Sequence, residues 1–288
     1  MVFEIPKSKF NGPFSLKFTL GSDQSPSDIW CLKEEKYRGF TIEGRGTPVV
    51  TWEDDTTLFI DSKEDVRDKI LYHFWSDYNL SDFYSKFAKD NYLSKTIEAC
   101  HGLRVMRHLD IKYGIIEGIL TQNSSTKRTR RMESCLRNSY GNSYTVDLRE
   151  IARASEEELQ QKCKVGYRAR YIVNIARKIL NEDLNFEEIK QMDSSDARKQ
   201  LLKIDGIGPK VADIILLFCF GKSDAFPMDR WLRKALKREY FDRSEKTDRE
   251  LREFALNRFG EHSGIAHLYM FYYERKVLAR KNSCGSAL

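Results

Sequence analysis

The sequence predicts an α+β protein in which an N-terminal antiparallel β-sheet domain, residues 1–64, packs on a mainly α-helical body, residues 65–288. Two observations lead to this prediction. Short β-branched or aromatic segments, separated by turn residues, occupy the chain up to about Asp61. From about Asp65 onward, apolar residues recur at helical spacing instead, and no internal repeat is evident.

Five short segments are predicted to be strands. The first, Phe14–Leu20, strictly alternates apolar and polar residues, which is the pattern of a half-buried strand. The others are D-I-W-C-L, R-G-F-T-I, P-V-V-T-W and T-T-L-F-I, at residues 28–32, 38–42, 48–52 and 56–60. Since these segments are short and separated by turn residues, we expect a small antiparallel sheet that ends near Asp61.

The helical body shows its clearest pattern at residues 171–180, Y-I-V-N-I-A-R-K-I-L. One stripe of this predicted helix is apolar and comprises Tyr171, Ile172, Ile175, Ala176, Ile179 and Leu180. We expect two helical subdomains, residues 126–244 and residues 65–125 together with 245–288, with an active cleft between them.

Charge is unevenly distributed along the chain. The whole sequence carries a net charge of +6, with 41% hydrophobic and 32% charged residues, as in ordinary globular proteins. Residues 121–180 alone hold 13 Lys or Arg and only 6 Asp or Glu. A nucleic-acid backbone is a natural partner for such a basic region, although a solvated helical surface also explains part of it.

Membrane insertion and secretion are not expected. The N-terminus lacks an apolar signal core, and the longest apolar run, Ile214–Phe220, is far too short to span a bilayer. We therefore expect an intracellular protein. The six cysteines lack C-x-x-C spacing, which argues against a disulfide framework or a zinc site; they are Cys31, Cys100, Cys135, Cys163, Cys219 and Cys284.

A glycine hairpin between two apolar helices is the most informative local feature. Gly206 and Gly208 permit a tight turn, and Pro209 has the φ suited to the first position of a helix. The segment is therefore predicted to be a helix-hairpin-helix over residues 196–220. The free N–H groups and the dipole of the second helix would bind a phosphate at the hairpin.

Two residues near this hairpin suggest nucleophilic chemistry. Lys210 lies near the N-terminus of the second helix, where the helix dipole and the apolar residues around it lower the pKa of an amine. Asp229 follows Pro227 and is predicted to cap the next helix, from where its carboxylate could face Lys210. Taken singly, a solvated lysine and a capping aspartate remain the simpler alternatives.

Together, G-I-G-P-K-V-A-D at 206–213 and F-P-M-D at 226–229 resemble the helix-hairpin-helix (HhH-GPD) superfamily of DNA glycosylases. The lysine resembles that of its bifunctional glycosylase/AP lyase branch, of the eukaryotic-like 8-oxoguanine type. The resemblance implies that Lys210 attacks the sugar carbon and that Asp229 stabilises the positive charge on the sugar. It implies no redox or organic cofactor and no metal, apart from a monovalent cation that could complete the hairpin turn. Some relatives bind an iron–sulfur cluster with four clustered cysteines after the catalytic helices. This chain has only Cys284 in that region, so it differs from those relatives.

Two further segments resemble those with which the family contacts the opposite strand. In T-Q-N-S-S-T-K-R-T-R-R, residues 121–131, the resemblance assigns Asn123 and Arg128 to the orphaned opposite base. In V-G-Y-R-A-R-Y, residues 165–171, it makes Tyr167 a wedge in the base stack and Arg168 a reader of the opposite cytosine. The alternatives are a basic loop that touches only phosphates, and a core tyrosine beside a surface arginine.

The resemblance also assigns a base pocket, with several departures from the family pattern. Phe271 would stack on the flipped base, and His267 replaces the glutamine that reads the base edge, which changes its donor and acceptor pattern and could make binding pH-dependent. Gln24 is the best anchor in the weakly matching N-terminal loop, residues 20–30. The remaining predicted contacts are Ile214 and Pro227 for the base, and Gly206, Gly208 and Trp231 for DNA.

The resemblance therefore implies a monomeric base excision repair enzyme that flips 8-oxoguanine out of double-stranded DNA, preferably opposite cytosine. It would excise the base through a Schiff base and β-elimination, in the cytoplasm or nucleoid of a prokaryote or the nucleus of a eukaryote. One alternative is a glycosylase of the same fold for another oxidised or alkylated base. The other is a non-enzymatic helix-hairpin-helix DNA-binding protein, which would need neither Asp229 nor the Tyr167–Arg168 pair.

Overall fold

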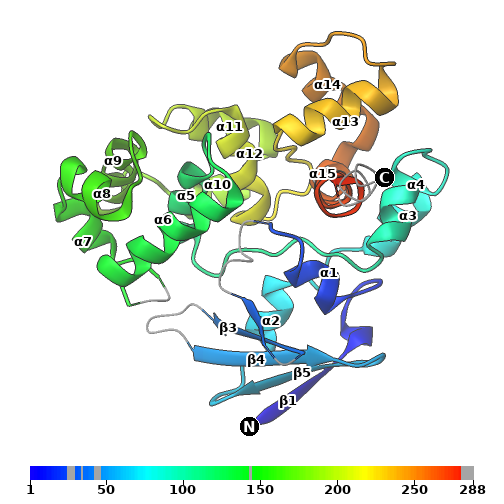
Figure 1. Ribbon diagram of the computed structural model, residues 1–288, viewed down its shortest axis with the longest axis horizontal. Helices are drawn as coiled ribbons and strands as arrows, with labels where there is room; N and C mark the ends of the chain where they lie inside the picture. Colours follow the sequence, from blue (N-terminus) through cyan, green and yellow to red (C-terminus); the bar gives the residue numbers. More distant parts are fainter. Residues whose placement is uncertain (25–29, 34, 42–46, 143–144, 280–288) are drawn as a thin grey trace, which may run out of the picture.

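The protein consists of one antiparallel sheet with a larger helical part stacked on it (Figure 1). The computed structural model describes residues 1–24, 30–33, 35–41, 47–142 and 145–279. The sheet has five strands in the order β1-β5-β4-β3-β2, all antiparallel to their neighbours. Their bounds are β1 Val2–Pro6, β2 Cys31–Lys33, β3 Lys36–Thr41, β4 Thr47–Glu53 and β5 Thr57–Ser62. The predicted α+β class and the position of the sheet are confirmed.

The first predicted strand is wrong. Residues Leu16–Leu20 form the short helix α1, capped by Ser15, whose side chain accepts from the Phe18 N–H at 3.3 Å. Leu16 and Leu20 lie one helical turn apart and are both buried, so the same apolar spacing serves a helix. The strand that sequence analysis missed is β1, whose residue Val2 pairs with Asp61 at the start of the register.

Apart from α1 and the turn η1, the helices follow the sheet in the sequence. Their bounds are α2 Arg67–His73, α3 Leu80–Phe87, α4 Leu93–Ala99, α5 Ile111–Leu120, α6 Thr126–Ser139, α7 Leu148–Arg153, α8 Glu156–Cys163, α9 Arg168–Leu180, α10 Phe186–Gln191, α11 Ser194–Leu202, α12 Pro209–Phe218, α13 Arg230–Tyr240, α14 Asp248–Phe259 and α15 Ser263–Tyr272, with short turns η1 Lys7–Lys9 and η3 Gly260–His262 and a final π-helix η4 Tyr273–Leu278. Helices α11 and α12 lie between the group α6–α9 and the group α13–α15 (Figure 1).

The predicted helix-hairpin-helix is formed by α11 and α12. Every residue of α12 from Val211 to Phe218 is buried, including the carboxylate of Asp213. This carboxylate accepts hydrogen bonds from Arg198 of α11 at 2.8 Å and from Arg252 of α14 at 3.2 Å. A buried charge is tolerated only where it is paired, and the pairing fixes α12 to helices on both sides.

Among the described residues, buried apolar side chains form two cores, one shared by the sheet with α1 and α2 and one in the helical part. Val66 and Ile70, beyond the predicted boundary at residue 64, pack in the core of the sheet. Arg104 joins the two parts, because its guanidinium donates to main-chain carbonyls that include those of Asn11 at 2.7 Å and Trp75 at 2.8 Å. In the described ranges, no helix is long and apolar enough to cross a bilayer.

The prediction of no disulfide is wrong. Cys135 of α6 and Cys163 of α8 form a disulfide, with Cα atoms 5.3 Å apart. Their separation of 28 residues carries no motif, so only the packing of α6 against α8 brings the two thiols together. Cys100 and Cys219 are buried free thiols, and Cys284 lies outside the described residues.

Candidate active site

The hairpin places Lys210 at the second position of α12. Gly206 has a φ of +87°, and a Cβ there would lie 2.3 Å from the Tyr171 ring, so only glycine fits this turn. Gly208 caps α12, and Pro209 occupies its first position. These three residues explain why the turn is tight and why Lys210 has a fixed position in the first turn of α12.

The Lys210 amine is held in surroundings that favour its neutral form. Burial lowers the pKa of Lys210, and the nearby Asp229 carboxylate only partly opposes this shift. Among the described residues, the amine makes no hydrogen bond and no ion pair. A neutral amine with its lone pair free is the form that attacks an electrophilic carbon.

Asp229 is the N-cap of α13, as predicted. Its carboxylate accepts from the N–H groups of Trp231 at 2.8 Å and Leu232 at 2.9 Å, which fixes its direction. Burial raises the pKa of Asp229, while the Leu232 N–H and the charges of Lys210 and Arg275 act in the opposite direction. Burial thus shifts Lys210 and Asp229 toward their neutral forms, and each lies within electrostatic range of the other.

His267 lies beside this pair. Burial lowers the pKa of His267 to about 3, and the charge of Lys210 adds to this effect. A hydrogen bond from the ring to the Pro227 carbonyl acts in the opposite direction. Its Nδ1 atom is buried and has no hydrogen-bond partner in the described part of the chain. His267 is therefore a neutral imidazole with a free ring nitrogen, and the pH dependence suggested for it is not supported.

Phe271 stacks on His267 one helical turn later on α15, with ring centroids 5.9 Å apart and an angle of 16° between planes. The Arg275 guanidinium lies over the same phenylalanine, 4.8 Å from the ring centroid. Asp23 of the N-terminal loop approaches Arg275 at 3.6 Å and pairs with Lys276 at 2.5 Å. Sequence analysis missed Asp23 and Arg275, and the only signal was the four-residue spacing between Phe271 and Arg275.

Gln24 lies in the same N-terminal loop but faces the protein interior. Its side-chain amide donates to the Arg104 carbonyl at 2.9 Å, and its Oε1 accepts from the Met106 N–H at 2.7 Å. The side chain therefore holds the loop in place. Residues 25–29 of the weakly matching loop lie outside the described residues, so the predicted contact of Gln24 with substrate stays a prediction.

The predicted opposite-strand residues gather at one place next to the hairpin. Tyr167 is 49% exposed, and its hydroxyl accepts from the Asn123 amide at 3.2 Å. Arg128, in the first turn of α6, is exposed and lies close enough to Arg168 to lower its pKa, after the larger effect of burial. An exposed ring beside an exposed amide and a cation forms a polar surface that DNA could contact.

Arg168 differs from its predicted position. It is only 1% exposed, and its guanidinium donates to the carbonyls of Gln122 and Val165, with Nε 3.1 Å from the Gln122 oxygen. The alternative of a core tyrosine beside a surface arginine is wrong, because Tyr167 is exposed and Arg168 is buried. Reading an opposite base would require this buried guanidinium to become accessible to DNA.

Two of the remaining predicted residues lie near the hairpin. Ile214 follows Lys210 by one turn on α12 and is buried. Trp231 lies in the first turn of α13, with the Arg230 guanidinium 5.3 Å from its ring centroid. Ile214 belongs to the helical core, against which Trp231 and Phe271 also pack, and the predicted contacts of Ile214 and Trp231 with base and DNA stay predictions.

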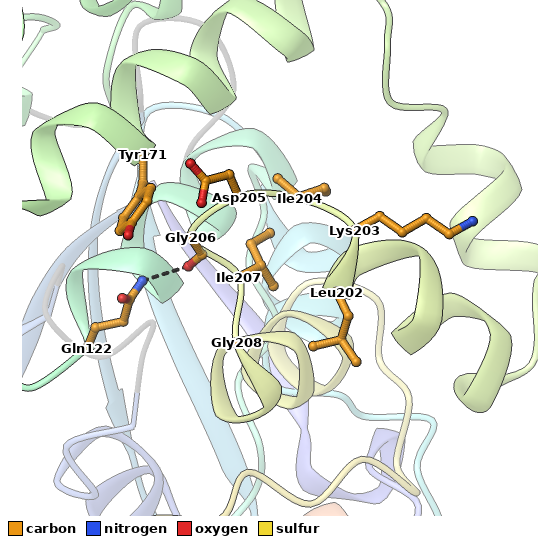
Figure 2. A pocket seen from close by; sticks show the side chains of 9 residues that line it. All are labelled: Gln122, Tyr171, Leu202, Lys203, Ile204, Asp205, Gly206, Ile207 and Gly208. Atoms are coloured by element: carbon orange, nitrogen blue, oxygen red, sulfur yellow. Dashed lines mark hydrogen bonds between the residues drawn. The ribbon is translucent and has the colours of Figure 1, made fainter.

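An open pocket of about 580 Å³ lies at the hairpin turn (Figure 2). It is lined by Gln122, Tyr171 and the hairpin residues Leu202, Lys203, Ile204, Asp205, Gly206, Ile207 and Gly208. Two carbonyls of the turn already accept hydrogen bonds, that of Ile204 from the Ile207 N–H and that of Gly206 from Gln122. Each carbonyl oxygen keeps a second lone pair, so the monovalent cation expected at the hairpin stays a prediction.

The arrangement has two parts joined by the hairpin. One is an amine, a carboxylate, an unpaired imidazole nitrogen and an aromatic ring, around Lys210. The other is the exposed polar surface around Tyr167. Such a combination can attack a carbon of a nucleic-acid strand while a second surface contacts the partner strand.

Comparison with known proteins agrees with this interpretation. Residues 116–260 match the HhH-GPD superfamily base excision DNA repair proteins. A probable N-glycosylase/DNA lyase from Methanothermobacter thermautotrophicus is 33% identical, over 92% of this chain and 95% of the relative. The chain therefore belongs to the HhH-GPD superfamily of base excision DNA repair proteins.

Solved structures narrow the resemblance within that superfamily. MBOgg1, in complex with a low affinity DNA ligand, has a TM-score of 0.84 and 28% identity, covering 92% of this chain and 93% of the other. The apo-form of Clostridium acetobutylicum 8-oxoguanine glycosylase/lyase has a TM-score of 0.79 and 25% identity, covering 91% and 93%. The fold is thus that of the 8-oxoguanine glycosylases.

Proposed function

We propose that this protein is a bifunctional DNA glycosylase/AP lyase that excises 8-oxoguanine from double-stranded DNA, preferably opposite cytosine. The observation that carries the proposal is the half-buried Lys210 amine, which has a lowered pKa, no hydrogen-bond or ion-pair partner among the described residues, and Asp229 nearby. The relatives that match over nearly the whole chain support the same reaction class.

In the proposed reaction, neutral Lys210 donates the Nζ lone pair to C1′ of the flipped nucleotide. The bond between C1′ and N9 breaks, and its electron pair leaves with the base, which takes up a proton. The Asp229 carboxylate stabilises the positive charge that develops on the sugar. Loss of protons from the attached nitrogen and opening of the sugar ring give an imine. Removal of a 2′ proton then expels the 3′ phosphate.

The base would enter beside Phe271 and His267. Phe271 offers a ring face for stacking, and the free Nδ1 of His267 can accept a hydrogen bond from a base N–H group. A guanine-derived base carries N–H donors on its edge, and 8-oxoguanine has an additional one at N7. A buried acceptor without a partner among the described residues would discriminate in favour of a base that satisfies it.

A panel of duplexes with single defined lesions tests the proposal. We expect release of 8-oxoguanine at least about tenfold faster opposite cytosine than opposite adenine, and slow release of 3-methyladenine. Asp229→Asn should lower 8-oxoguanine release by about 100-fold or more, because the amide lacks the stabilising charge.

Two results would redirect the proposal. Preferred release of an alkylated base would assign the same active site to a different lesion. Tight DNA binding with no base release and no strand cleavage would indicate the non-enzymatic alternative.

A further inference from the structure

Gln122 connects the hairpin to the opposite-strand surface. It lies just after α5, and its side-chain Nε2 donates to the Gly206 carbonyl at 2.8 Å (Figure 2). Its own main-chain carbonyl accepts from Nε of Arg168 at 3.1 Å and also from Nη2. One residue therefore bonds the hairpin through its side chain and the start of α9 through its main chain.

The groups on both sides of Gln122 are held firmly. Gly206 has no free space, because the Tyr171 ring occupies the position next to its Cα. On the other side, Asn123 adopts a φ of +41° and donates to the Tyr167 hydroxyl. The hydrogen bond from Gln122 therefore links two segments with defined conformations, the hairpin at Gly206 and the loop at Asn123.

We propose that Gln122 is a positioning residue that fixes the opposite-strand surface relative to the hairpin carrying Lys210. This inference rests on the proposed function. Lys210 lies only four residues after Gly206, and both belong to the segment expected to hold the damaged strand. A displacement of about 1 Å at a reacting centre can lower a rate by about 100-fold, so a fixed hairpin bears directly on catalysis.

A second link between the same segments is weaker. Arg170 of α9 and Asp205 of the hairpin form an ion pair at 3.2 Å, with side chains 53% and 60% exposed. Exposed ion pairs of this kind contribute little, because water and salt screen them. The hydrogen bond from Gln122 is partly buried, so it is the stronger link between the hairpin and the opposite-strand surface.

The test uses Gln122→Met, which keeps the side-chain length but cannot donate, and Gln122→Glu, whose carboxylate cannot donate at neutral pH. The matched control is Gln200→Met, because Gln200 is an exposed residue of α11 whose side chain accepts from Lys203 at 2.9 Å. Single-turnover cleavage is measured on duplexes with an abasic site opposite cytosine or adenine, and release is measured on 8-oxoguanine opposite cytosine. Thermal melting confirms that each variant is folded.

We expect both Gln122 variants to cleave about tenfold more slowly, with KM changed less than about twofold and the preference between opposite bases reduced. The ratio of the Gln122→Glu rate to the wild-type rate should rise as the pH falls toward 5, since a protonated glutamic acid donates again. The same ratio should stay flat for Gln122→Met. A purely structural role would lower the melting temperature without producing this difference.

Folded variants with wild-type rates and wild-type opposite-base preference would overturn the inference. So would a Gln122→Glu ratio that stays flat with pH. If instead the wild-type protein cleaves abasic duplexes but releases no 8-oxoguanine, the proposed lesion is wrong, and the abasic duplexes still test Gln122.

Discussion

Burial acts on both partners of the proposed reaction at once. It lowers the pKa of Lys210 and raises the pKa of Asp229, so the charged forms of both are disfavoured relative to water. The main-chain N–H groups at the start of α13 and the nearby Lys210 and Arg275 favour the Asp229 carboxylate. These groups limit the rise in the pKa of Asp229, although burial remains the larger effect.

This arrangement predicts the pH dependence of catalysis. The neutral fraction of Lys210 rises with pH through its lowered pKa, so the single-turnover rate should rise with a midpoint below about 10.4, the usual lysine value. His267 should not contribute between pH 5 and 9, because burial lowers its pKa to about 3 and the ring stays neutral. Rates measured from pH 5 to 10 check this.

His267→Gln separates the two groups. We expect the variant to keep the wild-type midpoint and to change the relative rates on different bases, because the amide also offers a donor. A wild-type transition near pH 6.5 that disappears in His267→Gln would show that the histidine titrates during the reaction and would contradict this assignment.

At the scale of elements, the disulfide holds together the two segments that form the opposite-strand surface. Helix α6 follows the Asn123 loop directly, and α8 leads into Val165 and Tyr167. A covalent link between α6 and α8 therefore restrains both sides of this surface. Intracellular disulfides are uncommon in mesophiles but frequent in proteins of hyperthermophilic archaea and bacteria.

Reduction of this disulfide should destabilise the protein. A loop closed over 28 residues is expected to contribute about 3 to 4 kcal/mol by restricting the unfolded chain. The double variant Cys135→Ala, Cys163→Ala should melt at a lower temperature than the oxidised wild type and be insensitive to dithiothreitol. An equal shift with dithiothreitol in both proteins would mean that the disulfide does not carry the effect.

Local sequence predicted some elements and missed others for physical reasons. The hairpin was predictable because positive φ, a capping glycine and a first-turn proline each require particular residues at Gly206, Gly208 and Pro209. The segment Phe14–Leu20 was not, since apolar residues at Leu16 and Leu20 satisfy a strand and a helix equally, and only Ser15 as a cap distinguishes them.

At the scale of the whole molecule, the parts are joined by buried polar side chains. Arg104 donates to carbonyls of the N-terminal segment and the helical part, and Gln24 bonds the chain at Arg104 and Met106. Burial lowers the pKa of Arg104 to about 10. Such contacts join residues up to 93 positions apart, so they follow from the tertiary fold and not from any local pattern.

The candidate site, too, was predictable from the sequence only in part. Lys210 and Asp229 were predictable because each occupies a defined position at the start of a helix. The burial of Arg168 and the link through Gln122 were not, because they depend on how the loop after α5 meets α9 and the hairpin. Family resemblance assigns residue types to positions, whereas the direction of a guanidinium depends on the carbonyls around it.

The central claim is that the fold presents Lys210 as the nucleophile at C1′. Borohydride trapping on a duplex with 8-oxoguanine opposite cytosine tests it most directly, since borohydride reduces the imine to a stable covalent adduct. We predict a trapped adduct with the wild-type protein and none with Lys210→Gln, although the variant should still bind the duplex. An adduct of wild-type yield in Lys210→Gln would contradict the account.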